Sequence, residues 1–168
     1  TIADKEAHRI ICQKLKSDFP TLPILSEESE NLTFEERKNL TSFFLVDPLD
    51  GTKEFINRNG EFTINIALIH GTEPVAGVVY VPVNRKLYYG DTRSCSSFLE
   101  SGGEKKQLTT RDLSTDLPIR IVASRRHGNK KLETVLKSAE ELFASAKVIN
   151  MGSSIKLCLL AEGKADFY

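Results

Sequence analysis

An acidic stretch directly follows an apolar run early in the chain. Residues 43–46 read Phe-Phe-Leu-Val, which predicts a buried strand, and residues 47–52 read Asp-Pro-Leu-Asp-Gly-Thr. Proline lacks the N–H group that a central strand needs, so the backbone is expected to leave the strand and turn at Pro48. Asp47 and Asp50 then lie on either side of the turn. Two desolvated carboxylates at one strand end repel each other, and a divalent cation is the simplest remedy.

The same six residues fit phosphate chemistry. The carboxylates of Asp47 and Asp50 and a backbone carbonyl are hard oxygen ligands that suit Mg²⁺. Gly51 permits unusual dihedrals or close approach of a ligand, and a helix that begins at Thr52 would offer backbone N–H groups to a phosphate. Metal and phosphate together indicate phosphoryl transfer to water. The plainer alternative is a turn without function, because Asp-Pro-x-Asp-Gly is also good turn chemistry.

Further acids stand upstream of this stretch. Glu27 and Glu28 follow a short apolar strand at 24–25, and adjacent glutamates are more often a solvated surface pair. A helix over 33–40, opened by a capping box, separates Glu27 from Asp47. With this helix looped out, the two strand ends can converge.

One more acid lies at the start of the chain. Asp4 occupies the N-cap position of a helix that apolar spacing predicts over residues 5–17. Capping alone would explain this aspartate.

The remaining elements must position these groups. Alternating and apolar runs predict consecutive strands at 62–70, 75–81, 87–90 and 96–99, which short turns join into an antiparallel sheet. The polar stretch 100–116 lacks periodicity and predicts a boundary between two domains, 1–116 and 117–168.

The second domain has the pattern of a βαβ layer with parallel strands, built from a strand at 119–124, a helix at 130–143, a strand at 147–149 and a helix at 155–163. His127 follows its first strand, and Ser153 and Lys156 follow the second. Ligands of open α/β sheets bind beyond the carboxyl ends of the strands, so these groups are candidates to hold a ribose, a base edge or a second phosphate. The alternatives are a loop histidine without ligand and serines that cap a helix.

Composition excludes several classes of function. The 168 residues carry 23 acids and 23 Lys plus Arg, so there is no basic excess to bind a nucleic-acid polymer. No apolar run approaches the ~20 residues that span a membrane. Three widely spaced cysteines predict reduced thiols of a cytosolic protein, all used for packing. Oligomeric state is left open.

Several motifs resemble a known family. The stretch 47–52 resembles the signature of the lithium-sensitive, magnesium-dependent phosphatase superfamily that includes inositol monophosphatases. Within it, residues 50–55, Asp-Gly-Thr-Lys-Glu-Phe, and residues 59–68 resemble the CysQ-like 3'(2'),5'-bisphosphate nucleotidases. The similarity runs over essentially the whole chain.

The resemblance implies a fold. It is an inositol-monophosphatase-like α+β layered sandwich of alternating α and β layers, with an antiparallel N-terminal sheet and a smaller βαβ layer. The resemblance also implies that the chain is a piece of a longer protein, whose missing C-terminal part carries a Trp-Asp motif with a further metal ligand.

The resemblance assigns roles residue by residue. Glu27, Asp47, the Leu49 carbonyl and Asp50 would hold two or three Mg²⁺ ions, and Glu27 would also serve catalysis. Asp4 and Thr52 would activate the attacking water. Substrate contacts would come from both halves of the chain, namely Glu27, Leu49, Asp50, Gly51, Thr52, His127, Ser153 and Lys156.

The expected activity is hydrolysis of adenosine 3',5'-bisphosphate to AMP and phosphate, with phosphoadenylyl sulfate as a second substrate. The open alternatives are an inositol or sugar phosphatase of the same superfamily, a non-catalytic nucleotide-binding protein and a purely structural fragment. The resemblance further implies lithium sensitivity, a role in sulfur assimilation and a cytoplasmic location, with peripheral association at the inner membrane as a second expectation.

Overall fold

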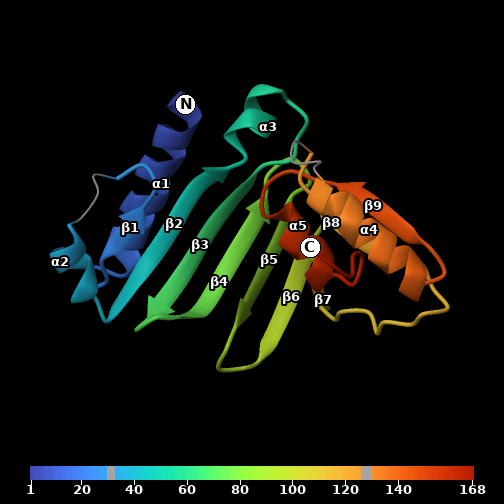
Figure 1. Cartoon of the computed structure of the whole chain (residues 1–168). Coiled ribbons are helices and arrows are strands. Elements are labelled where there is room, and N and C mark those ends of the chain that lie inside the picture. Colours follow the sequence, from blue (N-terminus) through green and yellow to red (C-terminus); the bar gives the residue numbers. More distant parts are fainter. Residues whose placement is uncertain (30–32, 126–129) are drawn as a thin grey trace. The chain divides into compact units, whose positions relative to one another are not determined.

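The chain folds into two compact units. A computed structural model describes residues 1–29, 33–125 and 130–168 (Figure 1). The first unit comprises Thr1–Gln107 and the second Leu108–Tyr168.

Within the described residues, the first unit contains a seven-stranded sheet whose spatial order follows the chain. Its strands are β1 (Ile24–Ser26), β2 (Ser42–Asp50), β3 (Thr63–His70), β4 (Glu73–Val81), β5 (Lys86–Asp91), β6 (Ser96–Ser101) and β7 (Glu104–Gln107). The strands from β2 to β7 pair antiparallel, as predicted, whereas β1 pairs parallel to β2. Strand β7 falls in the stretch predicted to be an irregular boundary, because its lysine-rich sequence carries no apolar alternation.

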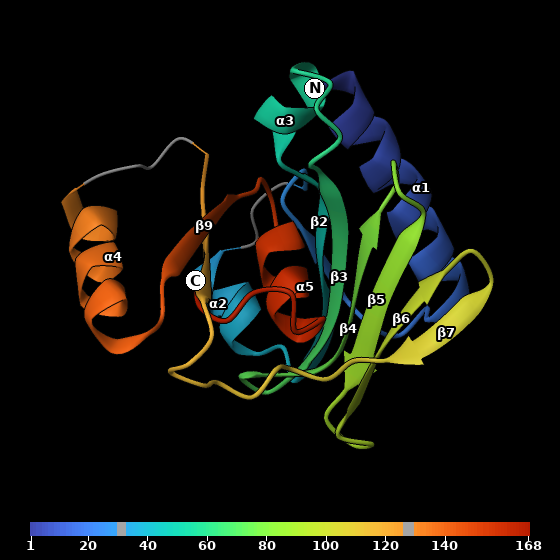
Figure 2. The ribbon, with the colours of Figure 1, turned by 90° about the vertical axis from the view of Figure 1, so that its right-hand side faces the viewer.

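The first unit also contains α1 (Ile2–Asp18), α2 (Phe34–Lys38) and α3 (Thr52–Ile56). Helix α1 runs along one face of the sheet (Figure 2), where it contacts β1 and β2. Phe19 and Phe44 pack with ring centroids 5.2 Å apart. Buried Cys12, Phe44 and Val46 belong to the apolar core of this unit. The predicted capping box of α2 is confirmed: Thr33 Oγ1 accepts the Glu36 N–H, and the Glu36 carboxylate accepts the Thr33 N–H.

The prediction that the strand ends at Pro48 is wrong. Strand β2 continues through Pro48 to Asp50, with Asp47 opposite Asn65 and Asp50 opposite Thr63 on β3. Four residues of β2 therefore oppose three of β3, which is a β-bulge. A proline is tolerated at a bulge, and the pairing of β2 with β1 ends before Pro48.

The prediction that Asp4 caps α1 is also wrong. The N-cap is Thr1, whose Oγ1 accepts the Asp4 N–H at 3.4 Å. Asp4 lies in the first turn of α1, where a carboxylate favourably faces the positive end of the helix dipole.

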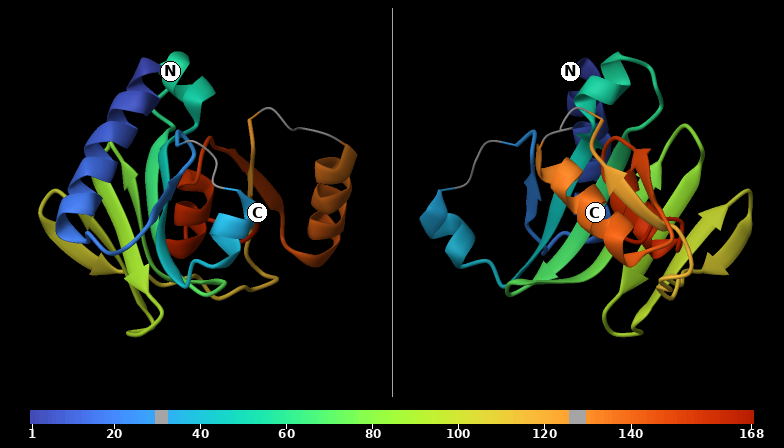
Figure 3. Two further views of the ribbon diagram at one scale, coloured as in Figure 1. Left: turned by 90° about the vertical axis from the view of Figure 1, so that its left-hand side faces the viewer. Right: turned by 45° about the vertical axis from the view of Figure 1, so that its right-hand side comes forward.

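The second unit contains the predicted parallel strands. Its elements are β8 (Ile119–Ala123), α4 (Lys130–Leu142), β9 (Ala146–Asn150) and α5 (Ile155–Ala161). Helix α4 covers the β8–β9 pair (Figure 3), and its Ala139 is buried together with Ile119 and Ile121 of β8. Leu132, Leu136, Phe143 and Ala146 pack around this core.

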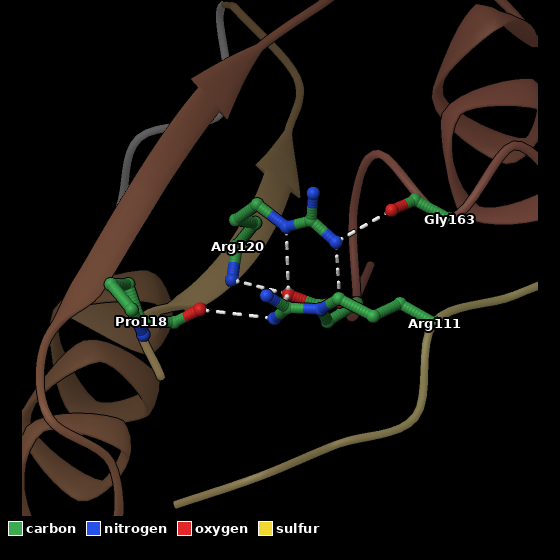
Figure 4. Close-up of polar contacts among 5 residues, drawn as sticks. Arg111, Pro118, Arg120 and Gly163 are labelled. Carbon is green, nitrogen blue, oxygen red and sulfur yellow. Dashed lines mark hydrogen bonds and ion pairs between the residues drawn. The ribbon is translucent and has the colours of Figure 1, made fainter. Parts of the chain in front are cut away.

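A buried aspartate ties three segments of the second unit together. Asp166, whose side chain is 1% exposed, accepts hydrogen bonds from Arg111 and Arg120. Figure 4 shows the two guanidinium groups, which also donate to the backbone carbonyls of Pro118 and Gly163. The stretch before β8, β8 itself and the end of the chain are thereby held in one arrangement.

The cysteines are free thiols in different surroundings. Cys12 and Cys158 are buried, as predicted, but Cys95 is exposed in the turn before β6, so its predicted packing role is wrong. Its backbone has a φ of 49°, and its Sγ donates to the Thr92 carbonyl. In the ranges that the structure describes, no helix is long and apolar enough to cross a membrane.

Candidate metal and phosphate site

Glu27 and Asp47 come together because β1 and β2 run parallel. Ser26 lies opposite Val46, and the Glu27 N–H donates to the Val46 carbonyl at 3.1 Å. Glu27 therefore extends the register of β1 by one residue and lies beside Asp47. The two side chains are close enough to share a hydrogen bond when Asp47 is protonated, and Asp50 is close enough for its charge to act on Asp47. The predicted convergence of the two strand ends is thus seen in the structure.

The Asp47 carboxyl is strongly perturbed by these neighbours. Burial makes the largest contribution to raising its pKa, and the negative charges of Asp50 and Glu27 raise it further. The Leu49 N–H, which donates to Asp47 Oδ1 at 3.1 Å, opposes the rise but does not cancel it. The resulting pKa of Asp47 is about 6, against an ordinary value of 3.8. This carboxylate therefore lacks positive charge around it.

Residues of β3 complete the site from the other side. Thr63 is fully buried, and its Oγ1 donates to Asp50 Oδ2 at 3.4 Å. Asn65 lies directly opposite Asp47. Facing residues of an antiparallel pair project to the same side of a sheet, so Thr63 and Asn65 flank the acids. The sequence interpretation gave neither a role, although polar residues two apart in an apolar strand were the available signal.

The backbone after Asp50 forms the predicted helix start. Gly51 has φ 91° and ψ 43°, a left-handed conformation that glycine adopts readily. Helix α3 begins at Thr52, and the Gly51 carbonyl accepts the Phe55 N–H at 2.9 Å. The first N–H groups of a helix have no acceptor within the helix, so the Thr52 N–H can donate to an anion.

The chemistry of the donor set suits a hard divalent cation. Glu27, Asp47 and Asp50 offer only oxygen ligands, and the raised pKa of Asp47 marks uncompensated negative charge. In addition, Asn65 Oδ1 is buried and has no hydrogen-bond partner among the described residues. Among the residues that the structure describes, however, no group of three or more His, Cys, Asp or Glu side chains is placed to hold a metal ion. The assignment of the metal ligands therefore stays a prediction.

Asp4 is placed on α1 and is 4% exposed. Its backbone N–H and its carboxylate both contact the Thr1 side chain. These contacts involve Thr1 rather than the other acids, so the role of Asp4 in water activation stays a prediction.

In the second unit, Ser153 and Lys156 lie just beyond the carboxyl end of β9. Lys156 is buried, and its Nζ donates to the Ser153 carbonyl at 2.6 Å. Ser153 has a φ of 47°, and its Oγ accepts the Ile155 N–H. Ser154, the N-cap residue of α5, makes no capping bond through its side chain. His127, the third residue predicted for this part of the site, lies outside the described residues.

Comparison with known proteins identifies the family. The sequence pattern of the inositol monophosphatase family matches residues 1–168, which is the whole chain. The chain belongs to the inositol monophosphatase family. The membership predicted from the acidic motif is therefore confirmed, and membership implies dependence on a divalent metal.

The curated relatives refine this placement. The chain is 44% identical to the 3'(2'),5'-bisphosphate nucleotidase CysQ of Salmonella typhimurium over 168 residues, covering all of this chain and 64% of that protein. It is 42% identical to the CysQ protein of Escherichia coli strain K12, with the same coverage. The chain thus spans just under two thirds of the length of these relatives.

A solved structure of the same family has a similar fold. The crystal structure of CysQ from Bacteroides thetaiotaomicron, described as a bacterial member of the inositol monophosphatase family, matches with a TM-score of 0.86 and 38% identity. The match covers 99% of this chain and 65% of that one. The predicted layered α+β fold is confirmed.

Proposed function

We propose that the chain is part of a magnesium-dependent 3'(2'),5'-bisphosphate nucleotidase that converts adenosine 3',5'-bisphosphate and water to AMP and phosphate. The observation that supports this most is the coupling of Glu27, Asp47 and Asp50 at the ends of β1 and β2. The 42–44% identity to CysQ nucleotidases supports the choice of substrate. Phosphoadenylyl sulfate is the proposed second substrate.

In this proposal, Glu27, Asp47, the Leu49 carbonyl and Asp50 hold two or three Mg²⁺ ions. When bound, the ions supply Lewis-acid chemistry for the attacking water and the leaving oxygen. The hydrogen bonds from Leu49 to Asp47 and from Thr63 to Asp50 fix the two carboxylates before any ion arrives. Such preorganisation reduces the rearrangement that binding requires.

The other residues of the first unit orient the reaction. The backbone amides of Gly51 and Thr52 hold the phosphate that is cleaved, at the start of α3. Asp4 and the Thr52 hydroxyl orient the water and take its proton. The water oxygen then bonds to phosphorus, the bond from phosphorus to the 3' oxygen breaks, and that oxygen leaves on AMP and takes up a proton from solvent.

The second unit contacts the nucleotide in this proposal. Lys156 carries the positive charge, and its bond to the Ser153 carbonyl fixes the position of its ammonium group. Ser153 and His127 supply hydrogen bonds to the same ligand. This division of labour follows the functional boundary predicted at residue 116. A cytoplasmic location and a role in sulfur assimilation accompany the proposal, whereas association with the inner membrane stays a prediction.

The experiment measures phosphate release from adenosine 3',5'-bisphosphate by the intact gene product, with Mg²⁺ and with a chelator. We expect release that requires Mg²⁺, that Asp47→Asn reduces at least about 100-fold, and that millimolar Li⁺ inhibits. The exposed Asp112→Asn in the second unit is the matched control and should retain full activity.

Three outcomes would count against the proposal. Faster cleavage of inositol phosphate than of the nucleotide would point to an inositol phosphatase. Tight nucleotide binding without Mg²⁺-dependent release would point to a nucleotide sensor. If Asp47→Asn left both metal affinity and turnover unchanged, the acids would be purely structural.

A further inference from the structure

Asn65 presents an unexplained buried oxygen beside the acids. Its Oδ1 is inaccessible to solvent and, in the part of the chain that the structure describes, accepts no hydrogen bond. Buried polar atoms in native proteins are almost always paired, and where no protein group pairs them, an ordered water or an ion commonly does. The orphaned oxygen therefore indicates that its partner lies outside the described residues.

The position of Asn65 in the sheet shows what that partner contacts. Asn65 pairs with Asp47 across β2 and β3, and Glu27 continues β1 on the other side of Asp47. Facing residues on neighbouring strands project to the same side of a sheet. Glu27, Asp47 and Asn65 thus form one row of oxygen-bearing side chains across three adjacent strands.

The neighbours in this row cannot satisfy Asn65. Ionised carboxylates only accept hydrogen bonds, so Glu27 and Asp47 cannot donate to the amide oxygen. On the opposite side, β4 places Val79 against Asn65, and the Val79 side chain has no donor. A hydrated cation is the partner that satisfies the carboxylates and the amide oxygen together, because its bound waters donate and its charge attracts all of them.

We propose that Asn65 is a positioning residue of the cation site, whose Oδ1 accepts a hydrogen bond from a water of the cation held by Glu27, Asp47 and Asp50. This inference rests on the proposed function, because it assumes that the acids bind a cation. It adds a neutral oxygen on β3 to a site otherwise drawn from β1 and β2. Residues that hydrogen-bond to the ligands or waters of a metal, and not to the metal itself, contribute substantially to metal affinity.

The opposite orientation of the amide makes a different prediction. If the Asn65 side chain were rotated, its Nδ2 would donate to Asp47 and help to hold the carboxylate in place. A leucine of similar size would remove either interaction. An aspartate separates them, because it keeps an oxygen acceptor for a hydrated cation but replaces the donor with a repelling charge.

The test measures Mg²⁺ and Mn²⁺ affinity of the intact gene product by calorimetry, without substrate. We expect Asn65→Leu to weaken binding about tenfold and Asn65→Asp to bind at least as tightly as the wild type. Without metal, Asn65→Asp should melt at a lower temperature than the wild type. Added Mn²⁺ should raise the melting temperature of Asn65→Asp by more than it raises that of the wild type. Asn39→Asp, which adds the same charge at the exposed end of α2, should change neither affinity nor the Mn²⁺ response.

The outcomes separate this inference from the proposed function. Unchanged affinity in Asn65→Leu, or weakened affinity in Asn65→Asp, would overturn the inference. If Asn65→Leu does not fold, the Asn65→Asp result decides by itself. Asp47→Asn is the reference: loss of metal binding there with no effect at Asn65 would reject only the role of Asn65. No loss in Asp47→Asn would reject the proposed function as well.

Discussion

Arg120 and Asp166, 46 residues apart in sequence, form a two-pronged ion pair in the second unit. Arg120 Nε lies 3.1 Å from Asp166 Oδ2, and Arg120 Nη2 lies 3.0 Å from Oδ1. The backbone N–H of Arg120 donates to the same Oδ2 at 2.8 Å. Paired, planar hydrogen bonds of this kind are among the stronger polar contacts in proteins.

This pair makes the second unit sensitive to acid. Burial by itself would raise the pKa of Asp166, but hydrogen bonds from Arg120 and Arg111 outweigh burial and lower the pKa to about 2, from an ordinary value of 3.8. A carboxylate with a lowered pKa stabilises the fold above its unfolded pKa, and the contribution is lost as the pH falls toward the folded pKa. We expect about 2 kcal/mol of stability to disappear between about pH 4 and pH 2.

Asp166→Asn tests this contribution. Because the variant keeps the shape of the side chain but leaves two partly buried guanidinium groups without their counter-charge, it should lower the free energy of unfolding by about 3 kcal/mol at neutral pH. Its stability should also vary less with pH in the acid range. Urea unfolding, followed by circular dichroism, measures both effects, and the exposed Asp112→Asn serves as control. Equal acid sensitivity in wild type and Asp166→Asn would contradict the assignment.

The metal-free acids of the first unit should behave in the opposite way. The pKa of Asp47 is raised to about 6, first by burial and then by Asp50 and Glu27. The folded state therefore keeps the proton while the unfolded state loses it, and stability falls as the pH rises between about 4 and 6. With a chelator present, Asp47→Asn should be more stable than the wild type above this range, by about 2 kcal/mol.

Thermal unfolding at about pH 4 and about pH 8 measures this difference. Added Mg²⁺ should reverse the order at the higher pH, since only the wild type gains from the cation. If Asp47→Asn were less stable than the wild type at high pH without metal, the acids would not repel one another as the structure indicates.

Gly163 should not tolerate a side chain. Its φ is +65°, and a Cβ would lie 2.9 Å from the Thr109 carbonyl oxygen and 3.0 Å from the Arg111 nitrogen. Gly102 has a similar φ of +60° but nothing within 4 Å of its Cβ position. Gly102→Ala should therefore lower the free energy of unfolding by about 1 kcal/mol, because only its backbone conformation is unfavourable for alanine. Gly163→Ala should lower it by about 3 kcal/mol, because the added Cβ also clashes. The difference between the two variants in chemical unfolding measures the contribution of the clash. Equal losses of unfolding free energy would show that the backbone near Thr109 moves to make room for the Cβ.

Lys156 separates a substrate contact from a structural one. Lys156→Met keeps most of the side-chain volume but removes the ammonium group that donates to the Ser153 carbonyl. If the ammonium also contacts the substrate, the KM for adenosine 3',5'-bisphosphate should rise about tenfold while Mg²⁺ affinity stays unchanged. A lower melting temperature with an unchanged KM would instead assign Lys156 to the local fold alone.

Local sequence patterns predicted most of the helices and strands. Alternation over 62–70 predicted β3, and the capping box at Thr33 predicted the start of α2, because both signals are local. The acids Glu27, Asp47 and Asp50 were recognisable because polar side chains that end an apolar run are unusual. The parallel β8–β9 pair followed from the order of strand, helix and strand.

Local signals failed where a longer-range arrangement decided the outcome. Pro48 remains in β2 because a bulge against β3 accommodates it, and β7 forms because β6 offers an edge for pairing. Thr1 rather than Asp4 caps α1, a shift of three residues that helix periodicity cannot resolve. Cys95 is exposed because it occupies a turn, which its residue type does not reveal.

The sequence alone therefore indicated the kind of chemistry, because a set of carboxylates next to a helix start suits a cation and a phosphate. Only the tertiary structure determined how the set is built. The parallel register places Glu27 beside Asp47, and the antiparallel register places Asn65 and Thr63 against the acids. The reason is physical: residue types fix which atoms can bind, whereas hydrogen bonds between strands distant in sequence fix which of those atoms meet.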